Sequence, residues 1–194
     1  MLNKKTGVNL IELIVCMVLI SLVVLGFFSV ELFSRHHVIS SDRRAKLQND
    51  LSYSLEYISK YVQQSAGDIN NPAIKVYPTS GVQTGFQTHV DLNDPHTPND
   101  LSDDTWVIFY LNGNTLNSVQ DGVTEVLSDK VVSGFDNYIM PASPDKGFYV
   151  NITNQGAAVD IGLVARYFPG SAVSVDNPQT AMKTSLVSSG SSEH

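Results

Sequence analysis

The chain has 194 residues, of which 42% are hydrophobic and 16% are charged, and its formal net charge at pH 7 is -7. This length suits one modest domain plus an extension, and the composition excludes both a disordered chain and one embedded throughout in a membrane. The acidic balance argues against a nucleic-acid partner, which requires a basic surface. A single cysteine, Cys16, excludes an intramolecular disulfide and argues against a cysteine-based metal or redox site.

The N-terminal region contains an apolar segment long enough to cross a membrane. No charge occurs from Leu13 to Val30, and Val8–Leu10 extend the segment upstream. In a helix, roughly 20 such residues cross the hydrocarbon core of a bilayer. A cleaved secretory signal peptide is the first alternative, but this run is longer and lacks the small-residue cleavage pattern at its end. A plain single-pass anchor is the second alternative, and it does not account for Glu12.

Glu12 is the unusual residue of this segment. It lies between Leu10-Ile11 and Leu13-Ile14, inside apolar sequence. A carboxylate in that position costs several kcal/mol unless it is neutralised or paired. We therefore expect Glu12 to have a partner.

The residues around Glu12 carry a family resemblance. Lys4-Lys5-Thr6-Gly7 followed by Val8-Asn9-Leu10-Ile11-Glu12 resembles the prepilin peptidase site of type IV pilins and type II secretion pseudopilins. The resemblance implies a leader over residues 1–7, cleavage after Gly7 and N-methylation of Val8. Val8 and Asn9 stand where the family usually has Phe and Thr. The family also implies that Glu12 neutralises the new N-terminal amine of a neighbouring subunit during assembly.

The same resemblance implies partners and a location. The partners are other pilin or pseudopilin subunits, the prepilin peptidase and an inner-membrane assembly platform. The expected location is the inner membrane, crossed once by residues 8–30, with a periplasmic C-terminal domain, and then the pilus or pseudopilus. The charges alone leave the orientation open, because Lys4 and Lys5 precede the span while Arg35, Arg43 and Arg44 follow it.

Residues 31–67 are predicted to continue the helix in amphipathic form. Apolar residues recur at spacings of three and four along one face, namely Leu47, Leu51, Leu55, Ile58 and Val62. A second row of Tyr53, Tyr57 and Tyr61 is expected to pack against the body rather than bind a ligand. We expect the helix to end near Gly67, with Pro72 blocking continuation. Gly26 is the one candidate flexible point in the apolar half.

Residues 68–104 are predicted to form a long acidic loop with one short strand at Ile74–Tyr77. The acidic residues are Asp91, Asp94, Asp100, Asp103 and Asp104, and two histidines, His89 and His96, lie among them. Calcium is a candidate ligand for such an oxygen-rich loop, but the spacing does not match an EF-hand, and a solvated acidic loop is the favoured interpretation. Metal binding by the two histidines is the less favoured alternative, and no cofactor is expected.

The remaining sequence predicts antiparallel strands. The first hairpin joins residues 105–110 to residues 115–119 through Asn112-Gly113, and a short strand follows at residues 123–127. Residues 128–140 cross to a second hairpin, whose strands at 148–152 and 159–167 alternate apolar and polar residues. An edge strand is predicted at 181–187 and a disordered polar tail at 188–194. The fold class is therefore α+β, with a long N-terminal helix packed on a small antiparallel sheet in a body of residues 68–187.

The body also resembles the W/J type of minor pilin. The resemblance rests on Tyr110, Gly113 and Leu116 in the first hairpin, on Asp129, Val131 and Phe135 after it, and on Ser65-Ala66-Gly67 at the helix end. It favours a minor subunit of a pilus or of a type II secretion pseudopilus. A major pilin and a membrane-anchored periplasmic binding module remain the alternatives.

The sequence does not indicate an enzyme. It contains no Gly-x-Ser-x-Gly nucleophile motif, no phosphate-binding glycine-rich loop and no His-Glu-x-x-His metal motif. His36 and His37 follow the apolar segment and are expected on a solvated helix surface. The expected function is therefore structural.

Overall fold

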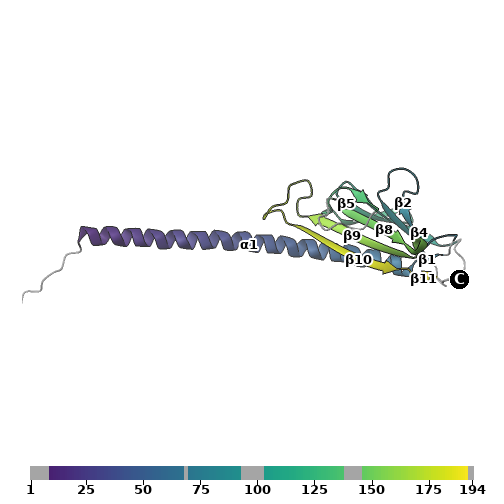
Figure 1. Cartoon of the computed structure of the whole chain (residues 1–194), viewed down its shortest axis with the longest axis horizontal. Helices are drawn as coiled ribbons and strands as arrows, with labels where there is room; N and C mark the ends of the chain where they lie inside the picture. Colours follow the sequence, from purple (N-terminus) through teal and green to yellow (C-terminus); the bar gives the residue numbers. More distant parts are fainter. Residues whose placement is uncertain (1–8, 68–69, 93–102, 138–145, 192–194) are drawn as a thin grey trace, which may run out of the picture.

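The computed structural model describes residues 9–67, 70–92, 103–137 and 146–191. One helix, α1 (Leu10–Gln64), has 55 residues and at 1.5 Å per residue extends roughly 82 Å. Figure 1 shows its N-terminal half projecting away from a body of strands that covers its C-terminal half. The long helix that the sequence predicts is therefore present, and it continues through Gly26 without interruption.

The end of α1 differs from the prediction by three residues. Ser65 leaves the helical conformation with φ -70° and ψ 142°, and its hydroxyl donates to the carbonyl of Val62 at 2.6 Å. Ala66–Gly67 then form the short strand β1. Gly67 is needed for close backbone approach, because a Cβ there would lie 2.3 Å from the amide nitrogen of Ala73. The glycine therefore serves β1 rather than the helix cap.

The strands form two main sheets. The five-stranded sheet has the order β2 (Ile74–Tyr77), β3 (Gly85–Val90), β4 (Thr105–Asn112), β5 (Thr115–Gln120) and β6 (Val123–Ser128), and all its neighbours are antiparallel. The four-stranded sheet has the order β10 (Gln179–Val187), β9 (Ala158–Arg166), β8 (Phe148–Thr153) and β7 (Phe135–Asp136). Only the pair β7–β8 in that sheet is parallel, and β1 pairs in parallel with β11 (Gly190–Ser191).

These elements confirm the α+β class and both predicted hairpins. Asn112 pairs with Thr115 across the first turn, where Gly113 has a φ of 60° that favours glycine. The second turn contains the one-turn helix η1 (Asn154–Gly156) between β8 and β9. The sequence predicted one small sheet, whereas the structure divides the strands between two.

Parts of two predicted irregular segments form strands. Within the predicted acidic loop, β3 pairs with both β2 and β4, so the prediction of a loop is wrong for Gly85–Val90. The predicted disorder of the tail is also wrong at its start. Ser188 donates from its amide to the carbonyl of Ala157 at 2.8 Å and from its hydroxyl to the carbonyl of Ser65 at 2.7 Å. The following residues form β11 beside β1.

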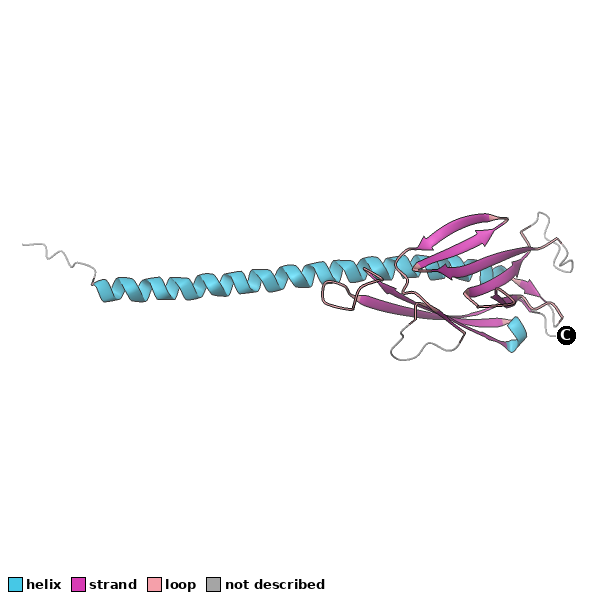
Figure 2. Ribbon diagram, turned by 90° about the horizontal axis from the view of Figure 1, so that it is seen from above, coloured by secondary structure: helices cyan, strands magenta, loops and turns pink. Residues whose placement is uncertain are grey.

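The C-terminal half of α1 lies between the two sheets (Figure 2). It contacts β6 and β10, which are edge strands of the five-stranded and the four-stranded sheet, and also the inner strands β3 and β9. For example, Ser54 donates to the carbonyl of Leu127 in β6 at 3.3 Å. The predicted apolar face is buried in a core shared by both sheets: Leu47, Leu51, Leu55, Ile58 and Val62.

The tyrosine row packs on the body at two of its three positions. The hydroxyl of Tyr57 donates to Glu125 at 2.9 Å, and that of Tyr61 lies 3.0 Å from the side-chain oxygen of Gln120. Both rings pack on Phe109. Tyr53 is exposed, and its ring contacts that of Tyr57 with a distance of 6.3 Å between the ring centres.

Candidate functional site

The candidate site is the N-terminal half of α1. Its large apolar side chains from Leu10 to Val30 are exposed. The most apolar window of 18 residues in the helix has a mean hydropathy of 3.0, and none of its residues is buried. A core helix of a soluble domain buries its apolar face, whereas this one presents apolar side chains all round. In length and composition, the helix could span a membrane.

The two serines of this half donate hydrogen bonds within the helix. The hydroxyl of Ser21 donates to the carbonyl of Met17 at 2.7 Å, and that of Ser29 donates to the carbonyl of Leu25 at 2.9 Å. An unpaired hydroxyl would be costly in hydrocarbon. These two serines are therefore compatible with a lipid environment or with the apolar interior of a helical bundle.

Glu12 lies in the first turn of α1. Asn9 precedes the helix in an extended conformation, and its carbonyl accepts from the amides of Glu12 at 2.9 Å and Leu13 at 3.2 Å. An acidic residue in a first turn interacts favourably with the helix dipole. Glu12 is exposed, and no ion pair to it occurs among the described residues. The predicted cleavage and methylation positions, Gly7 and Val8, lie outside those residues.

The uncharged stretch of the apolar half ends at Glu31. Glu31 pairs with Arg35 at 2.6 Å, and Asp42 pairs with Lys46 at 3.1 Å, both on exposed helix surface. His36 lies 3.5 Å from the carboxylate of Asp176, and His37 is exposed, as expected for a solvated helix surface. Such exposed pairs contribute little stability, but they mark where the helix surface changes from apolar to charged.

A second polar cluster lies in the five-stranded sheet. The imidazole of His89 lies 3.4 Å from the carboxylate of Asp104, and both side chains are buried. The ring of His89 stacks on Trp106 at 4.5 Å, and the ammonium of Lys75 lies 4.8 Å from the centre of the same indole. The sequence placed both titratable residues in a solvated loop, but the pairing of β3 with β4 buries them.

This cluster does not form a metal site within the described part of the chain. No group of three or more His, Cys, Asp or Glu side chains there is arranged to hold a metal ion. Three of the candidate ligands, Asp94, His96 and Asp100, lie outside the described residues, so the calcium hypothesis stays a prediction. His89 and Asp104 belong to the packed sheet.

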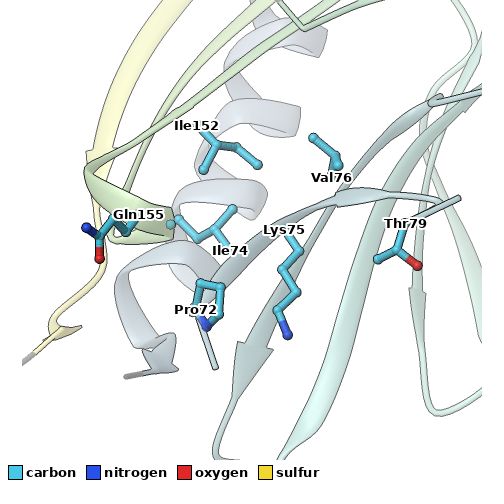
Figure 3. A pocket seen from close by; sticks show the side chains of 8 residues that line it. Pro72, Ile74, Lys75, Val76, Thr79, Ile152 and Gln155 are labelled. Carbon is cyan, nitrogen blue, oxygen red and sulfur yellow. The ribbon is translucent and has the colours of Figure 1, made fainter. Parts of the chain in front are cut away.

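A shallow hollow of about 420 Å³ lies between β2 and the β8–β9 turn. Its lining includes Pro72, Ile74 and Val76 from β2 and the residues before it, and Ile152 and Gln155 from β8 and the turn after it (Figure 3). The lining is mainly apolar. A specific small-molecule site has polar groups that converge on one point. The described residues that line this hollow do not provide such a group.

The chain matches no known family model, no curated protein and no solved structure. Its function must therefore be inferred from its own residues. The molecule presents a long apolar helix surface with one carboxylate near its start, attached to a body of two sheets. Such a surface can insert into lipid or pack against other apolar helices.

Sequence reasoning missed one feature next to the boundary at Glu31. The connection between β9 and β10 reaches α1, where the guanidinium of Arg43 lies over the ring of Tyr167 at 4.8 Å. The sequence signal was Phe168, which directly follows Tyr167 and departs from the period-two alternation of that strand. The partner on the helix, more than 120 residues earlier, could not be read from local pattern.

The burial of His89 predicts a pH-dependent stability. Burial lowers the pKa of His89 below its ordinary value of 6.5 and Lys75 lowers it further, while Asp104 and a hydrogen bond to Ala66 oppose this. The unfolded chain therefore binds more protons than the folded chain just below that value, and the free energy of unfolding should fall as the pH decreases through 6.5. Denaturant titrations in detergent on either side of that pH measure the change. In His89→Gln the decrease should be smaller, and an equal decrease would contradict the assignment.

Proposed function

We propose that the protein is a minor structural subunit of a type IV pilus or a type II secretion pseudopilus. One observation carries the proposal: the segment Lys4–Glu12, which resembles a prepilin processing site, leads into a helix whose apolar half stands free of the body. A subunit that joins a filament through its helix needs such a free half. The body on the other half would then lie outside the helical core.

The proposed role of Glu12 follows from electrostatics. After cleavage behind Gly7, Val8 carries a new terminal amine, and in the filament this amine of one subunit would lie beside Glu12 of a neighbour. In a low dielectric such a pair is favoured over either charge alone, and loss of one partner leaves a buried charge. The exposed position of Glu12 on an apolar helix supports this role.

The proposed route begins in the inner membrane. The chain would cross it once, with the leader in the cytoplasm, where the prepilin peptidase acts, and the body in the periplasm. The assembly platform would then transfer the mature subunit into a filament of other pilin or pseudopilin subunits. The free apolar half of α1 suits both environments, because lipid and a helical core are equally apolar.

Three features favour a minor over a major subunit. The chain has one cysteine and hence no intramolecular disulfide, its apolar half contains no proline, and the acidic segment before β4 is long. None of these features distinguishes a pilus from a secretion pseudopilus. A major pilin is the alternative within the same class.

Mass spectrometry of the mature N-terminus tests the proposal. We expect the membrane-extracted protein to begin at Val8 with one added methyl group, because the Gly7-Val8 junction resembles the processing site. Gly7→Val should remain full length, whereas Leu2→Ala, changed within the leader but away from the junction, should be processed normally. If the protein without substitutions keeps Met1, the result contradicts the proposal and favours a membrane-anchored binding module.

A further inference from the structure

The β9–β10 loop (residues 167–178) is held against α1 close to the boundary at Glu31. Arg43 lies over the rings of Tyr167 and Phe168, at 4.8 and 5.6 Å, and its guanidinium donates to the carbonyl of Asp176. The carboxylate of Asp176 lies 3.5 Å from His36. The loop therefore lies at the end of the body nearest the apolar half of α1 (Figure 1).

One buried side chain fixes the shape of this loop. Asn177 accepts from the amide of Phe168 at 2.7 Å, and its amide group lies within 3.3 Å of the carbonyls of Phe168, Ser171 and Ala172. Arg166 adds a bond to the carbonyl of Ser171 at 2.7 Å. The loop is thus preorganised, and it can bind a surface with little further loss of conformational entropy.

This ordered loop presents apolar side chains to the outside. Phe168, Val173 and Val175 are exposed, and Val175 is 65% exposed. The one charged residue of the loop, Asp176, is directed toward the helix through His36 and Arg43. An apolar group of side chains on a rigid loop indicates a contact surface.

The position of the loop along α1 suggests what it contacts. The loop contacts α1 at His36 and Arg43, which follow Val30 by six and 13 residues, or about 9 and 20 Å of helix. The headgroup layer outside the hydrocarbon core is about 5–7 Å thick. The loop lies to one side of the helix. Membrane helices are tilted by about 20° on average. A tilt of α1 toward the loop therefore brings the part of the loop beside His36 to the headgroups.

We propose that the β9–β10 loop rests on the bilayer surface before assembly and sets the direction in which α1 tilts. This inference rests on the insertion of α1 in a membrane, as in the proposed function. Lipid is favoured over a second copy of the chain, because lipid surrounds the adjacent helix half before assembly. Val173 and Val175 enter the interface, while Asp176 stays paired with His36 at the helix surface.

Tryptophan fluorescence in vesicles tests the loop. Val175→Trp and Val123→Trp are made in the full chain in a Trp106→Phe background, so that each protein has one tryptophan. Val123 is a matched control, because it is 70% exposed and lies beside Gln120, which contacts Tyr61. Tyr61 is 25 residues beyond His36, about 37 Å along the helix. The vesicles contain phosphatidylcholine and phosphatidylglycerol, and the phosphatidylcholine is brominated near the top of its acyl chains.

We expect brominated lipid to quench the emission of Val175→Trp roughly twofold and to leave Val123→Trp unchanged. Flotation of the vesicles reports separately whether the chain is anchored. Anchored protein without quenching at Val175→Trp overturns the loop contact and leaves the proposed function standing. Quenching at both positions also overturns it, as does a blue shift of Val175→Trp that depends on protein concentration, which would indicate contact with a second copy. Failure to float contradicts membrane insertion itself.

Discussion

Glu12→Ala is expected to lower incorporation into filaments by at least about a hundredfold while leaving insertion in the membrane intact. Removing one partner of a buried ion pair costs about 3–5 kcal/mol, because the other charge stays buried without compensation. Each 1.4 kcal/mol corresponds to about a tenfold change in an equilibrium. The helix itself should form as before, since alanine has the highest helix propensity. The effect should therefore appear in assembly alone.

The measurement compares the subunit in sheared filaments with the subunit left in membranes, in cells that lack their own copy. Glu31→Ala is the matched control, because Glu31 lies on the same helix but pairs with Arg35 on exposed surface. We expect it to assemble normally, since such surface pairs contribute at most about 1 kcal/mol. Normal incorporation of Glu12→Ala would show that the carboxylate has no role in assembly. Loss of the variant from the membrane fraction would instead indicate a failure of insertion.

Ile58→Ala is expected to destabilise the body by about 2–5 kcal/mol. Ile58 is fully buried on the face of α1 that packs between the two sheets. Its truncation removes apolar contacts and leaves a cavity that the strands on both sides cannot close completely. Because a domain of this size is stabilised by only about 5–15 kcal/mol, the loss should be large.

Denaturant titration in mild detergent, followed by the fluorescence of Trp106, measures this loss. Trp106 lies in β4, so its signal reports the body and not the apolar half of α1. Ile39→Ala is the matched control: the same change on the same helix, at a side chain that is 43% exposed. It should cost at most about 0.5 kcal/mol. Equal losses in the two variants would contradict the packing of α1 between the sheets.

The difference between β3 and the two hairpins shows where sequence reasoning succeeds. The hairpins are encoded locally, by Asn112-Gly113 in one turn and Asn154-Gln155-Gly156 in the other, between strands of apolar character. β3 contains Gln87, Thr88 and His89 in its middle and begins with a glycine. It is a strand because β2 and β4 lie on its two sides, and Gly85 permits this, since a Cβ there would lie 1.9 Å from the carbonyl oxygen of Phe109.

The candidate site and its surroundings likewise contain some features that the sequence predicts and others that it cannot predict. The sequence predicted the amphipathic face of α1, which the structure confirms in the burial of Leu51 and Ile58. The sequence could not predict that His89 is buried against Asp104, because that contact depends on the register of β3 beside β4. Nor could it predict that Arg43 holds the β9–β10 loop, whose residues come more than 120 positions later.

The sequence by itself therefore determined the apolar half of α1, the place of Glu12 within it and the face of the helix that packs on the body. These features depend on helical periodicity and on the cost of a charge in apolar surroundings, both of which act between near neighbours. Only the tertiary structure decided that the helix lies between two sheets and that an ordered apolar loop stands beside the boundary at Glu31. Those contacts join distant segments, and their free energy is gained only when the whole chain is folded.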